Sequence, residues 1–346
     1  MKTKILSILA LLLTVTQGAW AQTHTASFAT GNDNTGWTIA PASGVEGTTV
    51  TVSYSGENKV KSVTVKGKSA VVSAPTANNL TYTGSAQALV TAGTAVCGTM
   101  VYSLDGETYS DAIPTATNAG NYTVYYKVDG GTDYTGTTAQ TVNVTITIPG
   151  TIALLKSAIN SATNLDYINT NALGKYVTAT GTLQSTSAGA VGIITYMSKS
   201  AVDTDYSDSR IFVLALTDAS TGAKQCKSDT PEATYADKTA LNGHHATEHW
   251  HSWPSDFPAS EAARDYSASR PGGASSWFLP SEGQWKLGGS GVSNVMKQTL
   301  TASHNYWTST GNNGADNNGR VYDYTWGGIG SAQRISLYYV RSAFVY

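Results

Sequence analysis

A cluster of histidines is the part of the sequence whose residue types could bind a metal. His244, His245, His249 and His251 lie close together, and His245, Glu248 and His249 have the spacing His-x-x-Glu-His. On a helix this spacing places the two outer histidines on one face, where both could bind one Zn²⁺ while the glutamate acts as a base. A zinc-dependent hydrolase with His245 and His249 as metal ligands is therefore one alternative.

The surroundings of this motif favour another interpretation. Gly243 precedes it, Pro254 follows it, and no apolar periodicity supports a buried helix. A third zinc ligand would have to come from distant Glu261 or Glu282. We therefore expect a polar loop leading into a short helix over 260–266, with no catalytic site and no cofactor.

Other motifs of catalysis and ion binding are missing. The sequence has no Gly-x-Ser-x-Gly and no phosphate-binding Gly-x-x-x-x-Gly-Lys, and the acidic run Asp203, Asp205 and Asp208 lacks the glycine and the closing glutamate of a calcium loop. Cys97 and Cys226 are far apart in sequence and fall in separate predicted domains, so we expect no disulfide between them.

The C-terminal stretch has the composition of a recognition surface. Residues 298–346 contain no Lys, Glu or Met but many Asn, Tyr and Trp. Aromatic rings supply contact area with few rotatable bonds, and Asn and Ser supply adaptable hydrogen bonds. We therefore predict a shallow ligand-binding surface over 312–338. The candidate residues are Asn312, Asn313, Asp316, Asn317, Asn318, Arg320, Tyr322, Tyr324, Trp326, Arg334, Ser336 and Tyr338.

Alternation within this stretch predicts a strand. Arg320, Tyr322, Tyr324 and Trp326 would share one of its faces. This aromatic face either binds the ligand or belongs to the core, and the sequence leaves both interpretations open.

Composition excludes some classes of protein. Only 13% of the residues are charged, and the 21 basic residues are balanced by 23 acidic ones without forming a basic run, so we expect no nucleic-acid partner. Lys2 and Lys4, an apolar stretch over 5–15 and the small residues Ala19 and Ala21 predict a signal peptide over 1–21 that is cleaved on export. We expect a secreted or cell-surface protein without a transmembrane segment in the mature chain.

The elements that carry the predicted surface follow from alternation and turn residues. Regions 22–72 and 73–149 read as a small β module and a β-sandwich, because short alternating runs are separated by Gly and Asn turns. We expect a linker over 150–169 and an α+β domain over 170–346. In that domain a strand should end near Leu279, where Ser281 and Gln284 form a capping box that begins a helix. Strands are expected over 305–310 and 339–346.

Two segments resemble known families. The motifs around Tyr82 and Asn118 resemble bacterial immunoglobulin-like modules, which implies a spacer role. Trp277-x-Leu279-Pro-Ser with Trp285, then Tyr-Trp-x-Ser-Thr over 306–310 and a terminal Val-Arg, resembles C-type-lectin-like domains related to formylglycine-generating enzymes, as found in exported proteins of gut anaerobes. That resemblance includes early strands near 195–197 and 211–216. The active-site cysteine pair of the enzyme branch is missing.

The C-terminus also resembles proteins diversified by retroelements, in which variable positions lie between a fixed Tyr-Trp-x-Ser-Thr and a terminal Val-Arg. Adenine-directed mutagenesis of Asn codons never yields Lys, Glu or Met, which fits residues 311–338, with Gln333 and Trp326 as departures. We thus expect an exported, non-catalytic adhesion protein that binds a protein or glycan on another cell or surface. The alternative to both binding and zinc hydrolysis is a structural pilus-tip or surface-assembly subunit.

Overall fold

The computed structural model has a mixed α+β fold, made mostly of strands in several small sheets. The chain divides into two compact units. The N-terminal unit comprises 1–80, 86–116 and 121–145, and the C-terminal unit comprises 81–85, 117–120 and 146–346. The residues that the structure describes are 23–25, 37–40, 43–45, 50–54, 63–65, 67–132, 134–227, 237–253, 255–287, 294–311, 317–325 and 327–346. The predicted signal peptide lies outside these ranges.

The N-terminal unit begins with short strands within the region predicted as a small β module. In the three-stranded antiparallel sheet β2-β4-β5, Val52 pairs with Ile39 on one side and with Val63 on the other. A separate antiparallel pair joins β1 and β3. The bounds are β1 (Thr23–Thr25), β2 (Trp37–Ala40), β3 (Ser43–Val45), β4 (Val50–Tyr54) and β5 (Val63–Val65).

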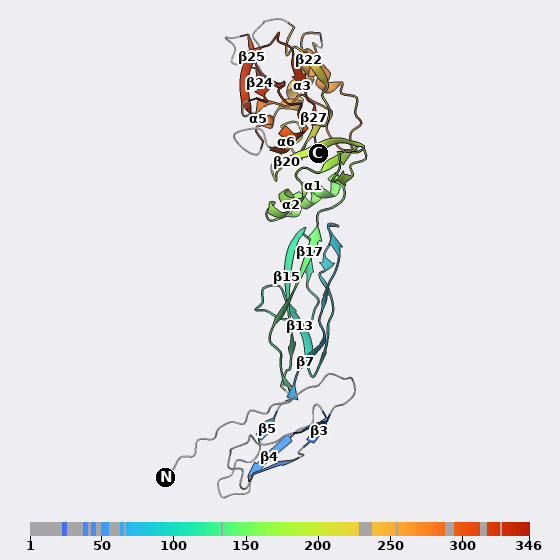
Figure 1. Ribbon diagram of the computed structural model, residues 1–346, viewed down its shortest axis with the longest axis vertical. Coiled ribbons are helices and arrows are strands. Elements are labelled where there is room, and N and C mark those ends of the chain that lie inside the picture. Colours follow the sequence, from blue (N-terminus) through green and yellow to red (C-terminus); the bar gives the residue numbers. More distant parts are fainter. Residues whose placement is uncertain are drawn as a thin grey trace, which may run out of the picture. The chain divides into compact units, whose positions relative to one another are not determined.

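The longest strands of this unit form the four-stranded sheet β13-β15-β17-β9 (Figure 1). As predicted, Val124, Tyr126 and Val128 share a buried face of β15. The predicted boundary between the two modules, at residue 72, falls inside β7, which pairs with β12. The remaining strands are β6 (Gly67–Lys68), β7 (Ala70–Ser73), β8 (Thr76–Ala77), β9 (Leu80–Thr81), β10 (Gln87–Ala88), β11 (Val90–Thr91), β12 (Thr94–Val96), β13 (Thr99–Ser103), β14 (Thr115–Ala116), β15 (Gly120–Asp129), β16 (Tyr134–Thr135) and β17 (Gln140–Thr147).

The region predicted as a linker, 150–169, contains one helix and most of a second. Helix α1 (Ile152–Ser161) begins at Thr151, whose side chain accepts a hydrogen bond from the N–H of Leu154, and α2 (Asp166–Ala172) follows. Ile152, Leu155 and Ile159 of α1 are buried. Their i, i+3, i+7 spacing is that of an amphipathic helix with one buried face.

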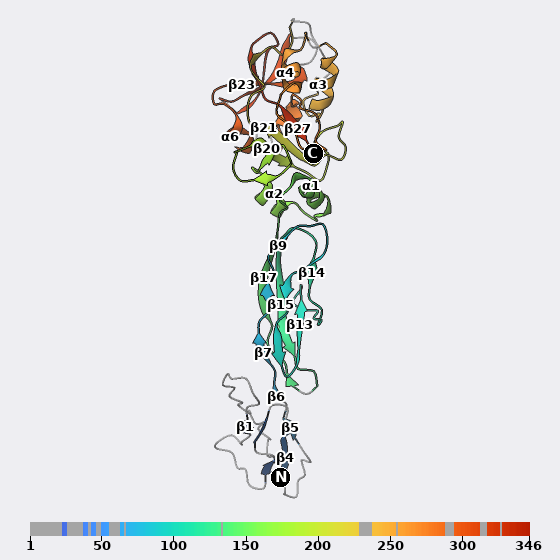
Figure 2. The ribbon, with the colours of Figure 1, turned by 90° about the vertical axis from the view of Figure 1, so that its right-hand side faces the viewer.

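Two five-stranded sheets form the C-terminal unit, in the orders β19-β18-β20-β21-β27 and β22-β26-β23-β24-β25 (Figures 1 and 2). The predicted strands near 195–197, 211–216 and 305–310 are confirmed as parts of β20, β21 and β23. The bounds are β18 (Tyr176–Thr178), β19 (Leu183–Gln184), β20 (Ala190–Met197), β21 (Ile211–Ala215), β22 (Ser220–Ala223), β23 (Asn305–Gly311), β24 (Asn318–Asp323), β25 (Gly328–Gln333), β26 (Tyr338–Val340) and β27 (Ala343–Val345).

The predicted last strand over 339–346 is in fact two strands in different sheets. The chain leaves β26 at Arg341, whose side chain is buried and whose Nη2 lies 2.8 Å from Asp218 Oδ1. It then enters β27, which pairs with β21. Arg341 thus holds the crossing between the two sheets in place, and the Val-Arg motif has a structural role here.

Four further helices lie in the described part of the C-terminal unit: α3 (Gly243–His251), α4 (Pro258–Arg264), α5 (Glu282–Trp285) and α6 (Asn294–Thr299). The predicted capping box is confirmed, since Ser281 Oγ accepts from the Gln284 N–H and Gln284 Oε1 accepts from the Ser281 N–H. The expected strand ending near Leu279 is only an isolated bridge between Phe278 and Ala343. The prediction of a polar loop around the histidines is wrong, because this segment forms helix α3.

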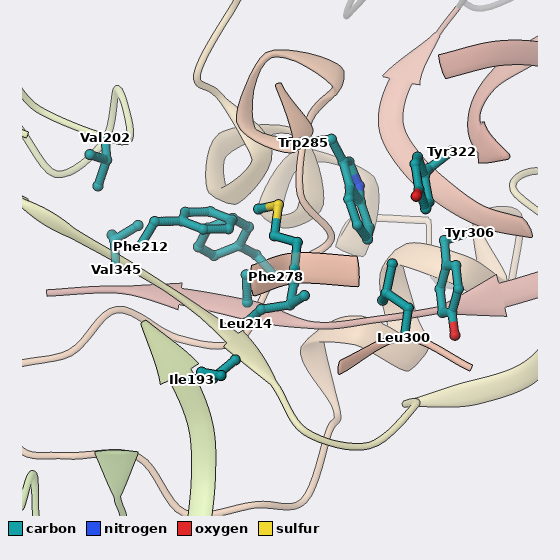
Figure 3. Close-up of a cluster of buried hydrophobic side chains, with 12 residues drawn as sticks. Ile193, Val202, Phe212, Leu214, Phe278, Trp285, Leu300, Tyr306, Tyr322 and Val345 are labelled. Atoms are coloured by element: carbon teal, nitrogen blue, oxygen red, sulfur yellow. The ribbon is translucent and has the colours of Figure 1, made fainter. Parts of the chain in front are cut away.

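The main core of this unit lies against α5 and α6. Figure 3 shows the ring of Trp285 facing that of Tyr322, with Tyr306 and Leu300 beside them. Phe212 and Phe278, from β21 and the segment before α5, extend the same cluster. The aromatic motifs of the sequence therefore supply the core of the unit.

None of the helices in the described ranges is long and apolar enough to cross a membrane.

Candidate functional site

The structure describes eight of the twelve residues predicted to bind a ligand. Asn312, Asn313, Asp316 and Trp326 lie outside the described ranges. Arg320 and Tyr322 lie on the same face of β24, as the alternation predicts, but α5 covers this face. There Arg320 pairs with Glu282 and Tyr322 stacks on Trp285. The predicted ligand-binding residues thus divide into some that are buried and others that are accessible.

Tyr322 belongs to the core and is not available to a ligand at the surface. Its side chain is fully buried, and its ring is parallel to that of Trp285 within 9°, at 5.4 Å between centroids. The hydroxyl has no hydrogen-bond partner among the residues described. Burial raises the pKa of Tyr322 from 10.0 to about 12, because the interior disfavours the charged phenolate.

This raised pKa predicts a loss of stability in alkaline solution. Between pH 10 and pH 12 the unfolded chain releases the Tyr322 proton while the folded chain retains it, so the free energy of unfolding falls with a slope of about 1.4 kcal/mol per pH unit. Tyr322→Phe removes this contribution. Urea titrations at pH 8, 10, 11 and 12 should show wild type losing stability relative to the variant only above pH 10. A stability difference between wild type and Tyr322→Phe that stays constant from pH 8 to pH 12 would contradict the burial of Tyr322.

Arg320 is also structural. Its Nε lies 2.5 Å from Glu282 Oε2, and its Nη2 donates to Glu282 Oε1 at 3.2 Å. Glu282 is fully buried and also contacts Lys286 one turn further along. Because a buried carboxylate needs a charged partner, the predicted ligand contact is instead an ion pair that joins β24 to α5.

Arg334 is buried below the predicted surface, with 1% of the residue exposed. Its backbone N–H donates to the Asn317 carbonyl at 3.1 Å, and its Nε donates to the Asn318 carbonyl at 3.3 Å. Its own carbonyl accepts from the N–H of Gln225 at 2.9 Å. Arg334 therefore holds the chain on both sides of it and does not present its charge to solvent.

The other predicted residues are accessible to different degrees. Asn317 is exposed, and Asn318, Tyr324, Ser336 and Tyr338 are partly buried. Tyr338 packs its edge against Trp307, at 5.0 Å between centroids, and leaves part of its ring at the surface. Asn317 and Asn318 lie at the start of β24, Tyr324 follows its other end, and Ser336 and Tyr338 lie at the start of β26. Polar and aromatic residues thus remain accessible after the buried residues are removed from the set.

The groups proposed for zinc chemistry have other partners in the structure. Glu248 Oε1 accepts from Arg264 Nε at 3.2 Å, and His249 packs on the ring of Trp253. His245 Nδ1 lies 3.0 Å from Asp205 Oδ1. The two glutamates considered as a third zinc ligand are also paired, Glu261 with His251 and Glu282 with Arg320. The structure does not assemble the predicted motif into a metal site.

A different cluster forms around His244, which the motif does not include. Asp203, Asp205 and His244 offer ligand atoms within 4.8 Å of one another, the one such group of three in the described ranges. Burial raises the pKa of Asp203. Its oxygens accept from the N–H groups of Asp205 and His244 and from Gln284 Nε2 at 2.7 Å. The residues are of the right type for a divalent cation, but Asp203 already holds the start of α3 in place.

His244 also connects two oxygen-bearing side chains. Its Nδ1 lies 2.7 Å from Asp205 Oδ2, and its Nε2 lies 2.9 Å from Ser276 Oγ. Sequence reasoning missed this arrangement, because the three residues are far apart in the chain and no local motif marks Ser276. In the sequence, only the run of histidines pointed to this part of the chain.

No family model, no curated protein and no solved structure matches the chain.

Proposed function

We propose that the chain is an exported ligand-binding protein in which immunoglobulin-like β modules carry a C-type-lectin-like head. The order of elements supports this architecture: β-only segments precede a unit in which short helices accompany two sheets. The ligand is a protein or glycan on another surface, and the binding surface comprises Asn317, Asn318, Tyr324, Ser336 and Tyr338, together with the predicted residues of 312–316.

One observation carries this proposal. Within a single stretch, Tyr322 and Arg334 are buried and Arg320 is held in an ion pair below the surface, while Asn317 is exposed and Tyr324 is only partly buried. A rigid frame below polar and aromatic surface residues reduces the entropy lost on binding. The same arrangement would let surface positions vary without disturbing the core, which agrees with the resemblance to retroelement-diversified proteins.

The test is ligand capture by the mature chain, residues 22–346, on a glycan array and on whole bacterial cells. The label belongs at the N-terminus, because the backbone of Tyr346 is hydrogen bonded to Ile211. The Asn317→Ala/Tyr324→Ala variant should lose at least tenfold in affinity, since central aromatic and polar contacts contribute about 1–2 kcal/mol each.

A matched control comes from α2 of the same unit. Tyr167 and Asn171 are likewise a partly buried tyrosine and an exposed asparagine. Tyr167→Ala/Asn171→Ala should bind as wild type does. Equal losses in the two variants, or self-association of the chain in place of ligand capture, would reject the binding surface and favour a structural assembly subunit.

A further inference from the structure

Ser276, His244 and Asp205 form a chain of hydrogen bonds from a hydroxyl through an imidazole to a carboxylate. Because Asp205 Oδ2 lies 2.7 Å from His244 Nδ1, an ionised Asp205 keeps the proton on Nδ1. Nε2 is then an acceptor, and Ser276 Oγ donates to it at 2.9 Å. This is the connectivity that lets an imidazole remove a proton from a serine hydroxyl.

The imidazole is fixed by its surroundings. The rings of Tyr206 and Phe278 meet it edge-on, with centroids at 4.8 and 5.9 Å. Its backbone N–H donates to buried Asp203, which also accepts from the N–H of Asp205. One carboxylate thus holds both the histidine and its acidic partner, and preorganisation of this kind is what a general base requires.

A hydroxyl donor lies beside the serine. Tyr206 OH lies 3.4 Å from His244 Nε2, the same nitrogen that contacts Ser276 Oγ. A neutral phenol next to a nucleophile can donate to the negative oxygen that develops when the nucleophile attacks a carbonyl.

We propose that Ser276, His244 and Asp205 form a catalytic site that hydrolyses esters of small acyl groups. Ser276 Oγ attacks the ester carbonyl as its proton passes to His244 Nε2. The bond to the alcohol oxygen then breaks, and His244 returns the proton to the leaving alcohol. Water, deprotonated by the same nitrogen, attacks the acyl-serine, releases the carboxylic acid and restores the hydroxyl. Asp205 stabilises the imidazolium throughout, and Tyr206 donates to the carbonyl oxygen.

The exposure of the site sets the substrate class. The His244 side chain is 12% exposed and that of Asp205 30%, and Ser276 is partly exposed, so the reacting atoms lie near the surface. A site at this depth suits a short acyl group on an exposed hydroxyl of a larger molecule. It uses none of the residues of the proposed binding surface and does not depend on it.

The experiment treats the mature chain with a fluorophosphonate probe and maps the labelled peptide by mass spectrometry. Hydrolysis of p-nitrophenyl acetate is measured in parallel, with and without EDTA. We expect labelling at Ser276. Ser276→Ala and His244→Ala should each lower the hydrolysis rate at least 100-fold, the range for loss of a nucleophile or a general base. Asp205→Asn should lower it while keeping the fold.

The matched control is His245→Ala, which removes the neighbouring histidine that also contacts Asp205. It should keep at least half of the rate. Wild-type protein that is folded but unlabelled at Ser276 would overturn the proposal, whatever the variants do. Labelling that persists in folded His244→Ala protein, or hydrolysis abolished by EDTA, would also overturn it, and the EDTA result would assign the cluster to a metal ion.

Discussion

Replacing Tyr322 by alanine is expected to lower the free energy of unfolding of the C-terminal unit by about 3–5 kcal/mol. The ring is fully buried and stacked on Trp285, within a cluster that includes Tyr306 and Leu300. The substitution removes both the buried apolar area and the stacking contact, and close packing prevents the neighbours from filling the cavity. Urea titration of residues 22–346, followed by tryptophan fluorescence, measures the loss.

Tyr324→Ala is the control for this result. Tyr324 is two residues further along the chain and only partly buried, so its loss should cost about 1 kcal/mol. A Tyr322→Ala protein as stable as Tyr324→Ala would show that the Tyr322 ring is not core. It would then return to the set of ligand-facing residues.

Arg320→Ala is expected to destabilise the same unit by about 3 kcal/mol, because it leaves the fully buried Glu282 without its main partner. Lys286 remains in contact with Glu282, but its side chain is 35% exposed and supplies less compensation. The measurement is again the free energy of unfolding in urea at pH 7. Any loss of ligand binding by this variant should follow its loss of folded protein.

Removing the charge of Glu282 provides the matching rescue. In Glu282→Gln/Arg320→Ala the buried group is neutral, so part of the lost stability should return. Suppose that Glu282→Gln lowers the free energy of unfolding as much in the Arg320→Ala background as it does in wild type. The two side chains would then be independent, and the ion pair would not be what joins β24 to α5. Lys286→Ala alone should cost less than Arg320→Ala.

The sequence was most informative where local chemistry determines structure. The capping box at Ser281 and Gln284 is confirmed in detail, because both hydrogen bonds join residues of one turn. Alternation located β15 for a similar reason, since a strand with one buried face has a period of two. These elements depend little on what packs against them.

The sequence was least informative where the partner of a side chain decides its role. Alternation placed Arg320 and Tyr322 on one face but could not show that α5 covers it. Helix α3 escaped prediction because the face that it buries, Gly243, Ala246, Thr247 and Trp250, is made mostly of small or polar residues. Asp203 and Asp205 contact its first turn, and Arg264 pairs with its glutamate. The site around His244 depends on three segments that only the fold brings together.

The pairing of β21 with β27 has a kinetic consequence. Phe212 pairs with Val345, and Leu214 pairs with Ala343, so neighbouring strands of one sheet are separated by most of the C-terminal unit. Closing so long a loop costs entropy before any contact compensates for it, and folding slows as the sequence separation of contacts grows. This sheet is therefore expected to form late in the folding of the unit, after the elements whose contacts are local in sequence.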